Sequence, residues 1–221
     1  MTSIYLLDTE NGSYESLEIL LPLWKERFQS LLTPAILSSA AWWIRRKVIG
    51  WGFLDMVLLL EANISLLDCE INISQHGKPE ITNYPSLHYN LSHSGPYFLI
   101  GVSSVPIGVD IEGYRKINPN LAKRVFTLEE QQRLPEISDP TYHQAFLTIW
   151  TRKESYTKAL GTGYQSAWDQ IQTDQPIETF QWFTQEDEKY VFSICYQQNQ
   201  TMTNHPIMTM DDLAEFYSHK L

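Results

Sequence analysis

Residues 150–163, WTRKESYTKALGTG, combine a helical pattern, a helix end and alternating charges. Trp150, Glu154 and Lys158 recur every four residues, so in an α-helix they lie along one face. Gly161 is a favourable residue just past a helix, and we expect the helix to stop there. A surface ion pair between Glu154 and Lys158, worth ~0.3–0.5 kcal/mol, is one interpretation of this face. A site that handles a metal ion and a phosphate is the other.

The flanking sequence extends this helix and adds further elements. Asp139-Pro140 is typical of an N-cap followed by proline at the first helical position, so the helix is expected to start there. Upstream, residues 127–134, TLEEQQRL, carry Thr127 and Glu130 at the spacing of a capping box. Downstream we expect a strand at 190–197 and a final helix in DDLAEFYSHK, residues 211–220.

The first half mixes helical and strand patterns in no regular order. Two helices are expected, at 15–32 with Pro22 as a possible break and at 38–52 with an end near Gly50 or Gly52. The absence of a regular βαβ alternation favours an α+β fold over a doubly wound sheet. The seam between an N-terminal half (1–104) and a C-terminal half (105–221) is expected at the SSVP turn. Strands are expected at 4–8, 69–74, 87–95, 97–104 and 108–112, with HGKPEI as a turn.

Composition narrows the class of protein. The chain has 221 residues, 43% of them hydrophobic, which is enough for a sizeable core. A net charge of −10 argues against a general nucleic-acid binder. The two cysteines are far apart, as in a reduced intracellular protein, and no signal peptide is recognisable. The most apolar run is interrupted by Glu61 and is too short to span a bilayer, so we expect a cytoplasmic protein without a membrane contact.

The segment GVDIE, residues 108–112, offers two carboxylates on one face of a strand. Alternation turns Val109 and Ile111 toward a core and Asp110 and Glu112 toward the other side. Residues two apart in a strand are separated by ~6.6 Å, so both carboxylates can reach one cation. Oxygen ligands suit Mg²⁺, and Glu154 could complete the set. A strand with one solvent-exposed face explains the same pattern, because the sequence pattern D-x-E is common.

Two turn-like motifs add polar groups. In NLSHSG, Ser92 and His93 are adjacent on a strand end and face opposite ways, so they are not a nucleophile–base pair. His93 could donate to a phosphate, or the motif could simply close a turn. In HGKPEI, Lys78 could present a cation at the edge of a cleft, although such turn lysines are usually solvated. GTG is too little for a dinucleotide-binding loop.

Taken in order, HGKP, YNLSHSG, PIGVDIE, AKRVFTLEE and WTRKESYTKALGTG closely resemble a 4′-phosphopantetheinyl transferase of the larger, Sfp type, over about residues 76 to 164. The resemblance implies transfer of the 4′-phosphopantetheine arm of coenzyme A to a serine of an apo carrier protein, with release of 3′,5′-ADP. It implies an α+β fold of two pseudo-symmetric halves with the active site between them. A monomer is expected from a chain that holds both halves.

The resemblance also assigns roles to single residues. It implies that Asp110, Glu112 and Glu154 bind Mg²⁺, with Mn²⁺ tolerated, and that Glu154 and Lys158 are catalytic. Lys78, Ser92, His93 and Lys158 are implied to hold coenzyme A, the co-substrate. Trp150 and Lys153 are expected to support the helix face. Glu130 matches an acid near the metal in this family, and the capping box is an equally good explanation of it.

One segment departs from the family pattern. Residues 33–43, TPAILSSAAWW, lack the basic side chains that usually serve the 3′-phosphate and adenine of coenzyme A. Arg45, Arg46 and Lys47 follow the segment, and none is assigned. Two other functions therefore stay open: a carrier-binding module that has lost efficient transfer, and another Mg²⁺-dependent phosphoesterase acting on nucleotides.

Overall fold

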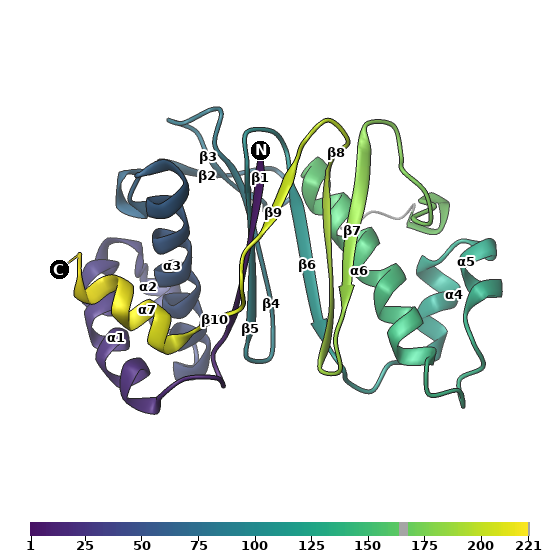
Figure 1. Cartoon of the computed structure of the whole chain (residues 1–221), viewed down its shortest axis with the longest axis horizontal. Helices are drawn as coiled ribbons and strands as arrows, with labels where there is room; N and C mark the ends of the chain where they lie inside the picture. The colour runs from purple at the N-terminus through teal and green to yellow at the C-terminus, as the bar shows by residue number, and fades with distance from the viewer. Residues whose placement is uncertain (164–167, 221) are drawn as a thin grey trace.

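The computed structural model describes residues 1–163 and 168–220 and has an α+β fold, as expected. Two sheets lie face to face in the middle of the molecule, and helices cover the outer side of each (Figure 1). The chain passes from one sheet to the other between β5 (Tyr97–Ser103) and β6 (Gly108–Gly113), at the turn expected to be the seam. Pseudo-symmetry between the halves stays a prediction.

The first sheet has the strand order β10-β1-β5-β4, and β9 also pairs with β1. All residues of β1 (Thr2–Asp8) and β5 are buried, as expected for strands covered on both faces. Strand β5 pairs antiparallel with β1, where Leu6 lies opposite Leu99. It also pairs antiparallel with β4, where Asn90 lies opposite Gly101. The remaining strands of the sheet are β4 (His88–Ser94), β9 (Met202–Asn204) and β10 (Met208–Thr209).

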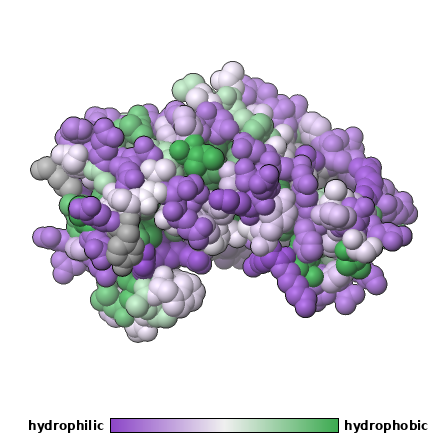
Figure 2. All heavy atoms as spheres, turned by 60° about the horizontal axis from the view of Figure 1, so that its bottom comes forward, coloured by the Kyte–Doolittle hydropathy of each residue, from purple (hydrophilic) through white to green (hydrophobic). Residues whose placement is uncertain are grey.

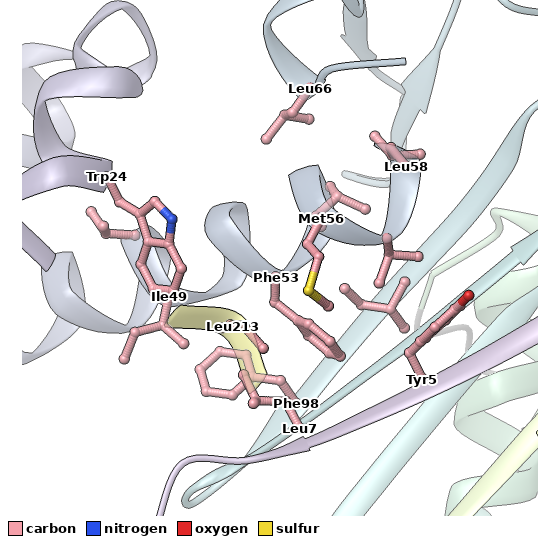
Figure 3. Packing of buried hydrophobic residues seen from close by; sticks show 14 of the residues in the cluster. Tyr5, Leu7, Trp24, Ile49, Phe53, Met56, Leu58, Leu66, Phe98 and Leu213 are labelled. Carbon is pink, nitrogen blue, oxygen red and sulfur yellow. The ribbon is translucent and has the colours of Figure 1, made fainter. Parts of the chain in front are cut away.

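Helices pack on the outer face of this sheet around a large apolar core (Figure 3). Trp24, Phe53, Phe98 and Leu213 meet there from three helices and one strand, and each is almost fully buried. Asp55 lies beneath them as a buried carboxylate that joins these helices by hydrogen bonds. The helices are α1 (Tyr14–Arg27), α2 (Pro34–Leu37), α3 (Ala41–Ala62) and α7 (Met210–Ser218).

The expected end of α3 near Gly50 or Gly52 is wrong, because the helix continues to Ala62. Asn63, with φ of 54°, ends it in the left-handed conformation that short amide side chains tolerate. Gly52 serves packing instead: a Cβ there would lie 2.3 Å from the Trp24 ring. Helix α1 likewise runs through Pro22 and stops at Arg27, short of the expected residue 32.

The segment HGKPEI is half turn and half strand. Its residues 79–81 form β3 (Pro79–Ile81), which pairs with β2 (Ile71–Ile73) in a small hairpin. Gly77, with φ of 85°, supplies the left-handed turn between them. The expected turn is therefore confirmed only for residues 76–78.

The second sheet has the order β6-β8-β7, with antiparallel pairing throughout. Its inner face packs on the first sheet, and the alternation expected for GVDIE is confirmed: Val109 and Ile111 are fully buried in that core. The partner strands are β7 (Phe180–Glu186), which the sequence reading missed, and β8 (Tyr190–Gln197), which it placed correctly.

Helix α6 (Tyr142–Leu160) covers the outer face of the second sheet (Figure 1). Its end at Gly161, with φ of 70°, is confirmed. Its start is later than expected, since Asp139 accepts hydrogen bonds from Thr141 and closes a turn before the helix. Beside it lie α4 (Ala122–Val125) and α5 (Leu128–Arg133), and short 3₁₀ turns occupy Gln29–Leu31, Leu66–Asp68, Pro119–Leu121 and Trp168–Gln170.

The C-terminal residues return to the first sheet. Strands β9 and β10 run parallel to β1, and α7 packs against α1, where Asp211 accepts hydrogen bonds from Ser13 and Ser16. The division of the chain at 104/105 stays a prediction about domains, and residues 202–218 lie with the N-terminal half in space (Figure 1).

Two surface properties follow from the described part of the chain. None of its helices is both long enough and apolar enough to cross a lipid bilayer. On the face that Figure 2 shows, hydrophilic residues predominate, and hydrophobic residues lie among them in separate groups. Isolated apolar groups of this kind are ordinary on a protein surface and do not mark a binding site.

Candidate active site

The site begins at the close approach of β6 to α6. A Cβ on Gly108 would lie 1.9 Å from the carbonyl oxygen of Ser155 and 2.4 Å from the amide nitrogen of Ala159. The two backbones therefore touch at a point that only glycine allows. This contact sets Asp110 and Glu112, further along the strand, against Glu154 and the helix end.

Strand β4 fixes β6 on its other side through side chains instead of a backbone ladder. Asn90, Ser92 and Ser94 point to the same face, and their side-chain oxygens accept hydrogen bonds from the amides of Val109, Ile111 and Gly113 at 2.8, 3.4 and 3.0 Å. The motif NLSHSG thus joins the two sheets. The sequence reading missed this role, although the period of two between these polar residues is its signal.

Asp110 lies deepest in the site and is 4% exposed. Its Oδ1 accepts hydrogen bonds from the Ser92 hydroxyl at 2.9 Å and from the Lys158 ammonium at 2.6 Å. Its Oδ2 is buried and has no hydrogen-bond partner among the described residues. A buried carboxylate oxygen left in this way is expected where a cation completes the site.

Glu112 and Glu154 lie closer to solvent than Asp110. Glu112 accepts a hydrogen bond from Ser94 at 3.1 Å and pairs with Arg115 at 3.2 Å. Burial, and after it the charge of Asp110, raises the pKa of both carboxyls, that of Glu154 to about 7. Glu154 is thus poised to exchange a proton near neutral pH.

The ion pair of Lys158 is not the Glu154 pair that was the alternative interpretation of this helix face. Its partner is Asp110 across the interface, and not Glu154 one helical turn away on α6. Burial lowers the pKa of Lys158, but the carboxylates of Asp110, Glu154 and Glu112 outweigh it and hold the pKa above its usual value. Lys158 is therefore charged and bound inside the acidic group.

A cavity of about 880 Å³ opens between the two halves and brings most of the expected residues together. Ser92, His93, Asp110, Glu112, Glu154 and Lys158 form the polar part of its lining. The apolar part of the lining includes Leu31, Trp43, Trp51, Leu54, Ile71 and Ile73. Its size is that of a pocket for a nucleotide-sized ligand.

Basic groups that the sequence reading left unassigned also line this cavity. Arg46 and Lys47 project from α3 beside His93, and the charge of Arg46 adds to burial in lowering the pKa of His93. Lys47 stacks over Trp43 with its Nζ 4.8 Å from the ring centroid. Basic side chains therefore do line the cavity, although they come from α3 and not from residues 33–43.

Lys78 and Glu130 lie away from the lining. The Lys78 ammonium donates to the carbonyls of Ile107 and Ala159, at 3.4 and 3.3 Å, near the end of α6. Glu130 forms the capping box with Thr127, so that alternative is confirmed, and it also forms a buried ion pair with Lys153 at 2.8 Å. Both partners of that pair are almost fully buried.

Trp150 and Lys153 support the helix from behind, as expected. Trp150 contacts Phe146 and Trp168 in the core under α4 and α5. The Lys153 ammonium also donates to the carbonyls of Trp168 and Ile171, which ties the segment after the helix to its inner face.

The acidic group fits a hard divalent cation in chemistry, though not in its present arrangement. Three carboxylates that line one cavity, one with a buried unpartnered oxygen, are suitable oxygen donors for Mg²⁺. Within residues 1–163 and 168–220, no three acidic, His or Cys side chains are already arranged around a common metal position. Lys158 and Arg115 each contact one oxygen of these carboxylates, on Asp110 and Glu112 respectively.

Comparison with known proteins identifies a family for this chain. Residues 106–210 match the family model described as the 4′-phosphopantetheinyl transferase superfamily. The chain is 29% identical over 143 residues to 4′-phosphopantetheinyl transferase Sfp of Bacillus subtilis, which covers 62% of this chain and 64% of that protein. It is 32% identical over 125 residues to 4′-phosphopantetheinyl transferase HetI of Nostoc, covering 54% of this chain and 53% of that protein.

A further relative is matched over a larger share of its length. The chain is 32% identical over 149 residues to 4′-phosphopantetheinyl transferase AcpT of Salmonella typhi, which covers 66% of this chain and 73% of that protein. For Sfp and HetI, the matched part of the chain spans less than two thirds of the relative's length. The family model and these relatives agree, and the chain belongs to the 4′-phosphopantetheinyl transferase superfamily.

Proposed function

We propose that this protein transfers the 4′-phosphopantetheine arm of coenzyme A to a serine of an apo carrier protein and releases 3′,5′-ADP. The observation that carries the proposal is the grouping of Asp110, Glu112, Glu154 and Lys158 on one wall of a cavity whose other wall holds Arg46 and Lys47. Membership of the family, and the names of its relatives, support the same activity.

The cavity suits a ligand with several phosphates. Arg46 and Lys47 offer cationic donors along one side, and such cations hold phosphate oxygens by charge-assisted hydrogen bonds. His93, whose pKa is lowered by burial, adds the N–H of a neutral ring. The apolar part of the lining, with Trp43 and Trp51, suits the stacking of a flat base. Lys78 is kept as a proposed contributor, which requires its ammonium to leave the two carbonyls that it now contacts.

The reaction is a displacement at phosphorus. The serine oxygen bonds to the phosphorus that carries the pantetheine arm, and the bond from that phosphorus to the bridging oxygen breaks. The bridging oxygen keeps the electron pair and leaves as part of 3′,5′-ADP. Glu154, which lines the cavity, takes the serine proton as the general base. A Mg²⁺ ion held by Asp110, Glu112 and Glu154 would neutralise the charge that grows on the phosphate oxygens.

Lys158 supplies positive charge to the leaving group. It lies next to the carboxylates and is held in the charged form by them. A charge of this kind lowers the barrier because it meets charge that develops only in the transition state. Lys158→Ala is accordingly expected to lower kcat by ~10²–10³-fold even at saturating coenzyme A.

Intact-protein mass spectrometry of an apo carrier protein tests the proposal. The carrier is incubated with the protein, Mg²⁺ and coenzyme A, and a mass gain equal to the phosphopantetheine arm is expected, with EDTA abolishing it and Mn²⁺ restoring it. Asp110→Ala is the matched inactive control. Binding of the carrier without a mass gain would instead indicate a binding module, and breakdown of coenzyme A without a carrier would indicate a phosphoesterase.

A further inference from the structure

Lys158 occupies the position of a cation within the acidic group. Its ammonium contacts Asp110 Oδ1 at 2.6 Å, the Ser92 hydroxyl at 3.2 Å and the carbonyl oxygen of Val109 at 3.3 Å. An ammonium has three hydrogens to donate, and these three oxygens can take all of them. A carboxylate, a hydroxyl and a carbonyl are also the oxygens with which proteins surround hard metal ions.

A divalent cation bound to Asp110 would be repelled by this ammonium. Mg²⁺ binds carboxylate oxygens at ~2.0–2.1 Å, and a lysine hydrogen-bonded to the same carboxylate would then lie within a few ångströms of it. Like charges at that distance repel strongly in a site where Asp110 is 4% exposed. Asp110 Oδ2 alone is available, since it is buried and has no partner among the described residues.

We propose that Lys158 is the resident counter-ion of the metal site, so that a divalent cation and the Lys158 ammonium compete for Asp110. The proposal rests on the proposed function in one respect, that the acidic group binds a metal. Lys158 has to turn away from Asp110 before the metal is fully bound, and an anionic diphosphate in the same cavity is the group toward which it turns.

Competition of this kind couples the two ligands. A diphosphate that draws Lys158 away makes room for the metal, and a metal that expels Lys158 delivers its charge to the diphosphate. By thermodynamic linkage, each ligand must then tighten the binding of the other by the same factor. Metal alone binds weakly, which keeps the carboxylates paired with protein cations until the nucleotide arrives.

The test measures metal binding without coenzyme A. Free Mn²⁺ is followed by electron paramagnetic resonance while it is titrated into the wild type, Lys158→Met and Lys78→Met. The two variants lose the same charge near the same end of α6, but only Lys158 touches a carboxylate of the site. Lys158→Met is expected to bind Mn²⁺ about tenfold to hundredfold more tightly than the wild type. Lys78→Met is expected to stay within about threefold of it.

The outcomes separate this inference from the proposed function. Asp110→Asn should remove Mn²⁺ binding; if it does not, or if no protein binds Mn²⁺, both the metal site and the competition are refuted. If Asp110→Asn does remove it but Lys158→Met binds Mn²⁺ no more tightly than the wild type, the metal site stands and the competition is wrong.

A second measurement needs no variant and so does not depend on how Lys158→Met folds. Trace acetylation of the wild type with acetic anhydride, read by peptide mass spectrometry, reports how free each lysine amine is. Saturating Mn²⁺ should raise the labelling rate of Lys158 several-fold and leave that of Lys78 unchanged. An unchanged or lower rate at Lys158 would overturn the proposal.

Discussion

Replacing Gly108 by alanine should damage stability and activity together, because it pushes β6 away from α6. The new Cβ would lie 1.9 Å from the Ser155 carbonyl oxygen, whereas ordinary contact begins near 3.4 Å. About 1.5 Å of movement is thus required of backbone on both sides, with no flexible side chain to absorb it. Overpacking of a rigid site costs up to ~3 kcal/mol or somewhat more, which corresponds to a fall in Tm of about 6–12 °C for a chain of this size.

The same movement displaces Asp110 and Glu112 relative to Glu154. Misplacement of reacting groups by about 1 Å costs ~10²-fold in rate, so the transfer rate of Gly108→Ala should fall by at least that much while folded protein remains. The assays are thermal unfolding followed by circular dichroism and carrier transfer measured well below the new Tm.

Gly113→Ala is the matched control in the same strand. The nearest atoms to its added Cβ lie 3.7 Å and 3.8 Å away, which is ordinary contact. Its Tm should stay within about 3 °C of the wild type. The reasoning is refuted if Gly108→Ala has the same Tm and the same transfer rate as Gly113→Ala. The close backbone contact would then matter neither for stability nor for activity.

Three further predictions concern buried charges. Asp55→Ala removes the acceptor of several buried hydrogen bonds and should lower the free energy of unfolding by about 3–5 kcal/mol in urea titrations; a loss under 1 kcal/mol would contradict it. Lys153→Met alone should cost a similar ~3–5 kcal/mol, and the double variant with Glu130→Leu should recover most of it, whereas additive losses would show that the pair is not coupled. With EDTA present, the raised pKa of Glu154, about 7, means that its contribution to stability is full below pH ~4.3 and is lost as the pH rises through 7. Glu154→Gln should therefore gain about 2–3 kcal/mol on the wild type between pH 5 and pH 8, and a constant difference between the two proteins would disprove this.

The local features of the fold could be predicted from the sequence. The capping box at Thr127, the helix end at Gly161 and the alternation of GVDIE all depend on residues within a few positions of each other. Local chemistry of this kind is visible in a single sequence. The end of α3 was mistaken because Gly52 looks like a helix terminator, while its real reason, the Trp24 ring 28 residues away, depends on tertiary packing.

Two of the missed strands, β9 and β10, have a similar cause. Strands β9 and β10 are short and contain no fully buried residue, and each is defined by pairing with β1 at the opposite end of the chain. Nothing in their own composition marks them, because the hydrogen bonds that form them come from residues about 200 positions earlier. For the same reason, the return of the C-terminus to the first half was not foreseen.

The candidate site shows the same division between local and distant causes. Asp110, Glu112, Glu154 and Lys158 could be named from their spacing and from the family resemblance, and the cavity gathers all four. The partner of Lys158 could not, because a helical spacing of four favours Glu154 and contains no information about β6.

The close approach of β6 to α6 decides whether Lys158 pairs with Asp110 or with Glu154. The φ of Gly108 is not in the left-handed region, so this glycine is needed for space and not for its backbone conformation. With the strand in contact with α6, Asp110 comes within 2.6 Å of the Lys158 ammonium and is buried there. The buried charge of Asp110 in turn helps to raise the pKa of Glu154. One missing Cβ therefore governs which carboxylate holds the lysine and which one has its pKa raised toward neutrality.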